Sequence, residues 1–160
     1  MYSYVADIIK QYKKDYYTKY IDKRFYYLSL IKETNKDKPY SIHGLWPQNN
    51  IDNPKDYPTY CRNVTFSINE IEPLLSKLKQ YWYSGNNIKS NDLDDENFWK
   101  HEYEKHGSCM FEQLNEYDYF NITLNLFQEV INTDTPDKYY NSNDNTCLIP
   151  ISLDFKVLNL

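Results

Sequence analysis

The spacing of apolar residues near the start of the chain predicts a helix followed by two strands. Apolar and tyrosine positions at helical spacing predict an amphipathic helix from residue 4 to about residue 20. Residues 24–31 are rich in aromatic and apolar side chains and predict a buried strand. After a polar turn at residues 32–38, residues 40–43 predict a second strand that delivers His43 at its end.

A second apolar stripe, further along the chain, predicts another helix. Its members are Ile71, Leu74, Leu75, Leu78 and Trp82. The sequence Ser67-Ile68-Asn69-Glu70 resembles a capping box at the start of this helix. Pro73 is tolerated because it lies near the helix start.

Polar segments between these stripes predict loops. Gly44 and Pro47 are expected to break regular structure after the second strand, and residues 48–60 form a long surface loop. Residues 84–97 form another polar loop, whose acidic cluster is well placed to cap the next helix.

The second half of the chain predicts two more helices and a strand. One helix ends at Gly107, and a further helix begins near Asp118. The tail from residue 149 to residue 160 alternates in the manner of a terminal strand. Separate strands and helices in this order indicate an α+β fold.

Composition bounds the class of protein. The 160 residues are enough for one domain with its own core, and 41% hydrophobic with 26% charged residues is ordinary for a globular protein. The net charge of −5 argues against a general polyanion binder. If RNA is the substrate, affinity must come from a local cationic site and from base stacking.

The sequence offers few signals for the protein's destination. The first ten residues lack the apolar region of a signal peptide, so either a signal was removed or the protein is not secreted by that route. Sequons at Asn63 and Asn121 permit glycosylation in the secretory pathway. No segment approaches the roughly 18 apolar residues of a membrane span, so we expect no membrane partner.

All three histidines lie in two short segments with rigid neighbours. One segment is residues 43–47, His-Gly-Leu-Trp-Pro, and the other is residues 98–107, Phe-Trp-Lys-His-Glu-Tyr-Glu-Lys-His-Gly. Imidazole is the side chain that exchanges protons near neutral pH. Their confinement to two segments predicts acid–base chemistry.

Four polar residues of the second segment share one face of a helix. They are His101, Glu102, Lys105 and His106. At about 100° per residue these positions lie, in that order, at roughly 0°, 100°, 40° and 140° around the helix axis. A phosphate over this face would meet two imidazoles and an ammonium group. The nearby carboxylate would tune the ionisation of the imidazoles and of the ammonium group. His43, from a separate strand, would supply a proton-transfer group on the opposite side of the phosphorus.

This arrangement suits the cleavage of RNA by its own 2′-hydroxyl. A neutral histidine removes the 2′ proton, a protonated histidine protonates the departing 5′ oxygen, and a cation stabilises the phosphorane-like oxygens. The chemistry needs neither a metal nor another cofactor, and DNA lacks the nucleophile.

Two other interpretations of the histidines were weighed. Residues 101–106 superficially resemble the zinc motif H-E-x-x-H, but the histidines are five positions apart and therefore about 140° apart on a helix. Lys105, directly before the second histidine, also opposes a dication. Alternatively, histidines beside tryptophans are hydrogen-bonded core residues, which suits a single histidine better than the full constellation.

The two segments closely resemble the active-site segments of the ribonuclease T2 family. The resemblance covers roughly residues 24 to 131, and it implies an α+β fold with a central antiparallel sheet flanked by helices. We therefore expect residues 1–23 to form a helical extension and residues 24–160 to form the ribonuclease T2-like domain. The implied activity is endonucleolytic cleavage of single-stranded RNA through a 2′,3′-cyclic phosphate.

The resemblance also implies a role for each site residue. By the family's mechanism, His106 is the general base, His43 is the general acid and His101 holds the phosphate. Glu102 and Lys105 stabilise the pentacoordinate state. Two aromatic residues match positions that line base-binding pockets, and they are Trp46 and Phe98. Trp99, in contrast, is expected to pack in the core.

The chain departs from the family pattern in several places. Tyr103 stands where tryptophan is usual and Ser108 where threonine is common. The family's disulfide after the first motif maps onto Cys61 and Cys109, and closing that loop would contribute roughly 4 kcal/mol. Cys147 has no visible partner. A secreted or endolysosomal compartment is the expected location, with an intracellular location as the alternative.

A rival interpretation keeps the fold but not the activity. A catalytically idle relative would bind RNA or a protein partner, with the tyrosine-rich N-terminal helix as its contact surface. Such a protein need not keep all five polar catalytic residues, which this chain does.

Overall fold

A four-stranded antiparallel sheet forms the centre of the fold. The computed structural model describes residues 22–85 and 92–159. The strands follow the spatial order β2-β1-β4-β3, and their bounds are β1 Phe25–Lys32, β2 Tyr40–Gln48, β3 Tyr140–Asn141 and β4 Thr146–Ile151. The helix expected between residue 4 and about residue 20 lies outside the described residues, as does most of the expected extension 1–23.

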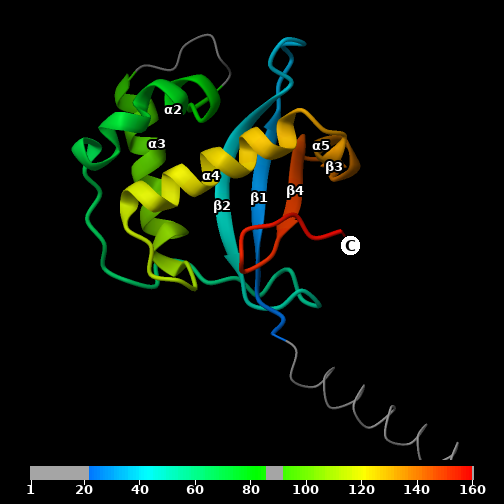
Figure 1. Cartoon of the computed structure of the whole chain (residues 1–160), viewed down its shortest axis with the longest axis horizontal. Helices are drawn as coiled ribbons and strands as arrows, with labels where there is room; N and C mark the ends of the chain where they lie inside the picture. Colours follow the sequence, from blue (N-terminus) through cyan, green and yellow to red (C-terminus); the bar gives the residue numbers. More distant parts are fainter. Residues whose placement is uncertain (1–21, 86–91, 160) are drawn as a thin grey trace, which may run out of the picture.

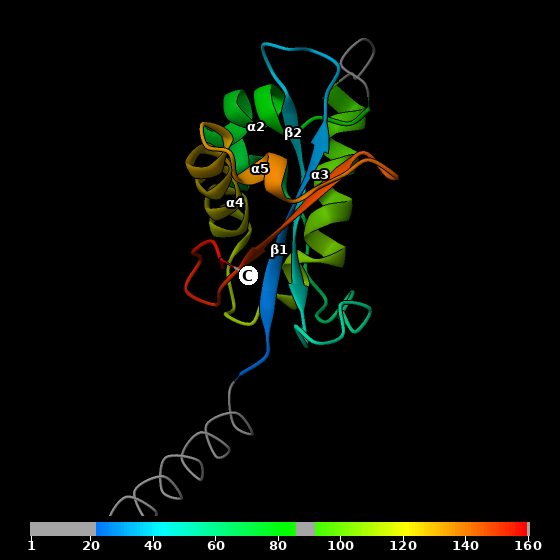
Figure 2. The same ribbon diagram turned by 90° about the vertical axis from the view of Figure 1, so that its right-hand side faces the viewer.

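The helices cover the two sides of this sheet. In chain order they are the 3₁₀ helix η1 Ile68–Leu74, α2 Leu75–Tyr81, α3 Asp92–Lys105, the short 3₁₀ helix η2 Gly107–Cys109, α4 Glu116–Ile131 and α5 Thr135–Lys138. Helix α4 crosses in front of the strands (Figure 1). Helix α3 runs along the other side, away from α2, α4 and α5 (Figure 2). The α+β fold with a central antiparallel sheet is therefore confirmed.

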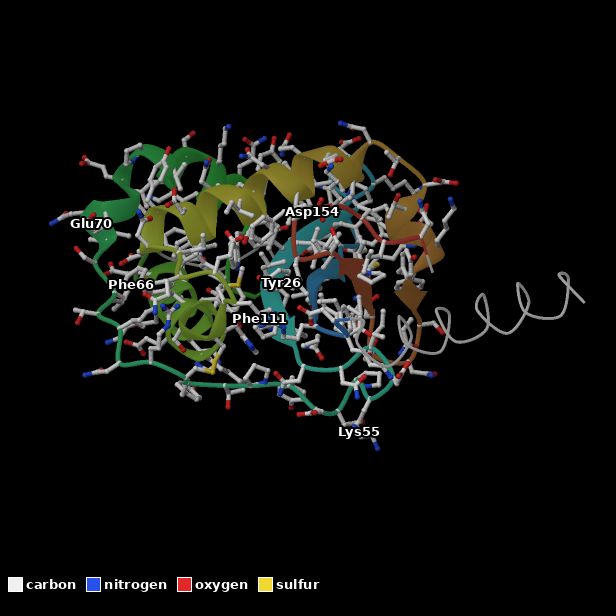
Figure 3. All side chains as sticks on the ribbon, turned by 60° about the horizontal axis from the view of Figure 1, so that its bottom comes forward. Tyr26, Lys55, Phe66, Glu70, Phe111 and Asp154 are labelled. Atoms are coloured by element: carbon white, nitrogen blue, oxygen red, sulfur yellow. A yellow bond between two sulfur atoms is a disulfide. The ribbon has the colours of Figure 1, made fainter. Side chains whose placement is uncertain are left out.

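The core lies between α4 and one face of the sheet. Alternate residues of β1 point towards α4 and are fully buried, namely Tyr26, Leu28 and Leu30. Phe120 and Phe127 of α4 are buried with them. At the lower end of the sheet Phe111 lies beside Tyr26, with ring centroids 5.4 Å apart (Figure 3).

The apolar stripe that predicted the helix near residue 71 is buried as expected. Its most deeply buried members are Ile71, Leu78 and Trp82. The capping box is not formed, because the Ser67 side chain makes no cap hydrogen bond. The backbone N–H of Ser67 donates instead to the carboxylate of Glu116, at 3.0 and 3.2 Å.

Three predicted boundaries were wrong. Strand β2 continues past His43 to Gln48; because β2 lies at the edge of the sheet, Pro47 costs no hydrogen bond to a further strand. The acidic cluster forms the first turns of α3 rather than the end of a loop, and acidic side chains favour a helix N-terminus.

The third error concerns the tail. Strand β4 ends at Ile151, and the chain then turns back. Ser152 Oγ accepts a hydrogen bond from the N–H of Lys156, and Phe155 has a φ of 60°. A polar turn of this kind interrupts the alternation, so only a single bridge, from Ile151 to Val157, continues the ladder.

No helix among residues 22–85 and 92–159 has the length and the apolar character required to cross a bilayer.

The buried carboxyl of Glu116 makes stability depend on pH. Burial, opposed by the hydrogen bond from Ser67 and helped by the charge of Glu70, raises the pKa of Glu116 to about 7. The folded state therefore binds the proton more tightly than the unfolded chain, and the stability that this provides is lost as the pH rises through 7. Glu116→Gln should raise the melting temperature at pH 8 by about 2–4 °C relative to the wild type, with a smaller gain at pH 5.

Thermal unfolding followed by circular dichroism at both pH values tests this expectation. Glu129→Gln, on an exposed position of the same helix, is the control and should change neither value. Equal effects of Glu116→Gln at pH 5 and pH 8 would contradict a titrating carboxyl at this position.

Candidate active site

A β-bulge presents His43 on the side of the sheet that faces α3. Ser29 of β1 pairs with Gly44, but the next residue, Leu30, pairs with Ile42, so His43 is the extra residue of the bulge. A regular strand would place positions 42 and 44 on one face. The bulge lets Ile42 join the core while His43 joins the face that carries Trp46, because the extra residue shifts the alternation.

Two buried indole groups hold the bulge in place. The Nε1–H of Trp82 donates to the carbonyl of His43 at 2.9 Å. The carbonyl of Trp82 in turn accepts the Nε1–H of Trp99 from α3 at 2.5 Å. This confirms the packing role expected for Trp99, which is 1% exposed. The chain of hydrogen bonds ties the backbone of His43 to the helix that carries the second motif.

Glu102 reaches the sheet because position 44 has no side chain. The carboxylate of Glu102 is buried and accepts the Nε1–H of Trp46 at 2.9 Å. Its other oxygen lies 3.7 Å from Nε2 of His43. A Cβ on Gly44 would clash with Oε2 of Glu102 and would lie 2.5 Å from Nε1 of Trp46. Glycine is therefore required here for close approach rather than for an unusual backbone angle.

The predicted site residues line one cavity of about 360 Å³ between α3 and the sheet. The two motifs contribute His43, Trp46, Phe98, His101, Glu102, Lys105 and His106. All seven predicted substrate and catalytic positions thus come together, although their chemical roles stay predictions. The shared face proposed for the four polar residues of α3 is the face that closes this cavity.

Five further residues line the same cavity and were not predicted from the sequence: Tyr27, Gln48, Pro54, Tyr57 and Leu148. Gln48 is 3% exposed, and its Oε1 has no hydrogen-bond partner among the described residues. Tyr57 is half exposed in the loop that follows β2, whereas Lys55 in the same loop points away from the body (Figure 3). An aromatic residue in an otherwise polar loop was the available signal for Tyr57.

Trp46 contacts both histidines that were predicted to move protons. Its ring stacks on the ring of His106, at 5.1 Å between centroids and 27° between planes. It meets His43 edge-on, at 4.9 Å and 75°. Phe98 packs on the other side of His43, at 5.8 Å. Trp46 therefore fixes the spacing of both imidazoles, and a contact with a nucleobase would be an additional role.

The environment of His106 favours its neutral form. Burial, and then the charges of Lys105, His43 and His101, lower the pKa of His106 to about 3. Its Nδ1 is buried and has no partner among the described residues. A neutral imidazole can accept a proton at its unprotonated ring nitrogen.

Desolvation shifts the pKa values of Glu102 and His43 in opposite directions, because the charged form is the deprotonated form of Glu102 but the protonated form of His43. Burial raises the pKa of Glu102 to about 7, against the opposing effects of Trp46 and Lys105. Burial, followed by Lys105 and His101, lowers the pKa of His43. The carboxylate 3.7 Å from His43 works against that lowering whenever it is ionised. At mildly acidic pH the carboxyl is protonated and can donate a hydrogen bond.

A strap formed by residues 60 and 61 closes the C-terminal end of α3. The backbone N–H of Tyr60 donates to the carbonyl of Lys105 at 2.9 Å. Cys61 forms a disulfide with Cys109, with 5.0 Å between the Cα atoms, which confirms the predicted pairing. Ser108 accepts the N–H of Cys61 at 3.0 Å, so the serine substitution noted above retains a hydroxyl that holds the strap. Cys147 is a buried free cysteine.

Comparison with known proteins identifies the family. The sequence matches the profile of the Ribonuclease T2 family over residues 8–144. The chain belongs to this family. Ribonuclease 1 of Arabidopsis thaliana is 37% identical over 59% of this chain and 40% of the relative. Ribonuclease T2 of Sus scrofa is 32% identical over 69% of this chain and 54% of the relative.

A solved structure supports the same fold. Human RNase T2 matches with a TM-score of 0.62 at 21% sequence identity, over 85% of this chain and 89% of that chain. The ribonuclease T2 fold is thus retained in a chain that spans about half of the length of the curated relatives it matches, or less.

The close packing at Gly44 predicts that this ribonuclease T2 family member is destabilised when a methyl group is added there. Gly44→Ala should displace the Glu102 carboxylate and break its hydrogen bond to Trp46, with a loss of stability of about 1–3 kcal/mol. Chemical denaturation followed by tryptophan fluorescence measures the change. Gly85→Asn is the control, because Gly85 is open to solvent at a φ of 74° that asparagine tolerates. A Gly44→Ala protein as stable as the wild type would show that α3 does not need this contact.

Proposed function

We propose that the protein is an endoribonuclease that cleaves single-stranded RNA by transfer to the 2′-hydroxyl. The observation that carries the proposal is the pair of imidazoles, His43 and His106, which both pack against Trp46 in a cavity that also contains a lysine. Membership of the Ribonuclease T2 family supports the same activity.

In the first step a proton moves at each end of the displacement. Neutral His106 accepts the proton of the 2′-hydroxyl, and the 2′ oxygen attacks phosphorus. His43, in its protonated form, donates a proton to the 5′ oxygen as the P–O bond breaks. The products are a 2′,3′-cyclic phosphate and a free 5′-hydroxyl.

In the second step the two histidines exchange roles. His43 removes a proton from water, the water oxygen attacks phosphorus, and His106 protonates the departing 2′ oxygen. The product is a 3′-phosphate, and both histidines return to their starting states.

The remaining groups stabilise the charge that develops on the phosphoryl oxygens. Lys105, which is half-buried, and His101, which is exposed, both line the cavity, where their ammonium and imidazole groups can meet a phosphate. Glu102, with its raised pKa, donates a hydrogen bond to an equatorial oxygen when it is protonated. These side chains supply the charge stabilisation by themselves, so the proposed reaction uses no metal ion.

The proposed working environment is oxidising and mildly acidic, as in secreted or endolysosomal compartments. The Cys61–Cys109 disulfide supports an oxidising compartment. A low pH suits the site, because it protonates His43 and Glu102 while His106 stays neutral.

The first test is an RNA cleavage assay in excess chelator at pH 5, with analysis of the new ends. We expect fragments that end in 2′,3′-cyclic phosphate and, later, in 3′-phosphate. His43→Ala and His106→Ala should each lower turnover by about 10²–10⁴-fold, because each removes a proton-transfer group. Circular dichroism and the melting temperature show whether each variant is folded.

A matched variant separates this result from a general loss of structure. Lys138→Ala removes an exposed side chain of α5, which lies on the side of the sheet away from α3 and does not line the cavity, and should leave turnover unchanged. Undiminished turnover in both purified histidine variants would refute the assignment. Intact RNA with a folded wild-type protein would favour the binding-module alternative, and loss of activity in chelator would favour a zinc hydrolase.

The pH profile gives a second test. The base must be neutral and the acid protonated, so kcat/KM should rise with pH through the pKa of His106 and fall through that of His43, which lies below 6.5. Lys105 lowers both pKa values. Lys105→Met should therefore move both limbs of the profile to higher pH while it lowers the maximal rate.

The matched control is Lys105→Arg, which retains the charge and should retain the pH limbs. A Lys105→Met profile that superposes on the wild-type profile after scaling would mean that Lys105 does not tune these histidines.

A further inference from the structure

A second hollow lies beside the catalytic cavity, next to the last turn of α3. It has a volume of about 440 Å³, within the range of small-molecule sites. Its walls are formed by Tyr60, Cys61, Arg62, Asn63, Val64 and Glu104. The mechanism above uses none of these side chains.

Tyr60 forms the boundary between the two hollows. Its ring lies 6.5 Å from the ring of His101, at 74°, and His101 lines the catalytic cavity. The side chain is 59% exposed, which makes it one of three large exposed hydrophobic residues among those the structure describes. Its backbone is held at a φ of 51° by the hydrogen bond to Lys105. A rigid backbone thus presents an aromatic face to solvent next to a proposed phosphate ligand.

Arg62 provides a fixed cation in the wall of the same hollow. Its Nε–H donates to the carbonyl of Ser108 at 2.7 Å, and the side chain is half-buried. This contact orients the planar guanidinium group before any ligand binds. The carboxylate of Glu104, which lies 3.9 Å from Lys100, and the exposed amide of Asn63 add hydrogen-bonding groups that suit the edge of a nucleobase.

We propose that this hollow is a subsite for one further nucleotide of the same RNA strand, beyond the two that flank the cleaved bond. The base stacks on Tyr60, and the phosphate that joins it to the cleaved dinucleotide lies near Arg62. This inference rests on the proposed ribonuclease activity and extends its substrate from a dinucleotide to a longer single strand.

The position of the hollow beside the catalytic cavity and the charge of the protein both favour this assignment. A strand that leaves the catalytic cavity over His101 meets the ring of Tyr60 next, because the two rings lie 6.5 Å apart. The protein carries a net charge of −5, so its affinity for RNA depends on local cations and on stacking rather than on a general positive field. Tyr60 and Arg62 supply one group of each kind within a single hollow.

The test uses substrates with only one cleavable position. Each is a short DNA strand with a single ribonucleotide, of the base that the enzyme cleaves fastest, so that only one bond has a neighbouring 2′-hydroxyl. The short substrate ends at the nucleotide after that bond, and the long substrates carry two further deoxynucleotides on the 5′ side, the 3′ side or both. We expect the wild type to have a kcat/KM about tenfold higher for the long substrate that reaches the subsite.

Variants of the hollow should abolish this length preference. Tyr60→Asn removes the ring but suits the positive φ, and Tyr60→Phe keeps the ring. The ratio of long to short kcat/KM should fall to about one in Tyr60→Asn, through KM, and should stay near ten in Tyr60→Phe. Arg62→Gln removes one cation, so the salt dependence of kcat/KM for the long substrate should fall by about one released counterion. Leu93→Ala, an exposed apolar residue at the start of α3, is the control and should keep the wild-type ratio.

Two results would overturn the inference: equal wild-type kcat/KM for all substrates, or an unchanged ratio in Tyr60→Asn. Its failure can be separated from a failure of the proposed activity by fluorescence anisotropy with the all-DNA version of the long strand, which cannot be cleaved. If the wild type cleaves none of the substrates but binds this strand about tenfold more tightly than Tyr60→Asn does, the subsite stands without the activity. Equal binding by both proteins would count against the subsite even if RNA is cleaved.

Discussion

The close approach of α3 to strand β2 is the contact on which the site depends. Glu102 can reach Trp46 and His43 only because Gly44 has no side chain. The same approach allows Trp99 of α3 to bond the carbonyl of Trp82, which in turn holds the bulge at His43. One missing Cβ therefore sets the distance between the two motifs, and the hydrogen bonds of three indole groups hold that distance.

This packing also sets the electrostatics of the cavity. Removing water from the space between helix and strand disfavours every charged form, so it pushes the pKa of the buried carboxyl up and those of the buried imidazoles down. A lysine nearby adds to the effect on the histidines. The result is a site in which a neutral imidazole and a neutral carboxyl coexist at mildly acidic pH, without any group having an unusual chemical structure.

Much of this could be predicted from the sequence, and the exceptions have physical reasons. The periodicity of β1 and of the stripe around Ile71 identified buried elements, because burial on one face leaves a repeating apolar pattern. The clustering of histidines identified the cavity. The length of β2 could not be predicted, since glycine and proline end most strands but are tolerated at a sheet edge beside a bulge. Gln48 was missed because its place in the cavity depends on the unpredicted length of β2, and Tyr57 because its place depends on how the loop after β2 folds back.

The order of the elements along the chain has a consequence for the time at which the cavity is complete. Its walls include Tyr27 from β1 and Leu148 from β4, which pairs with β1 only after more than a hundred intervening residues have been made. Chains emerge from the ribosome with the N-terminal part first. The growing chain therefore carries both histidine motifs for some time before the last wall is in place. A cavity built in this order is unfinished while the chain is still attached to the ribosome that makes it.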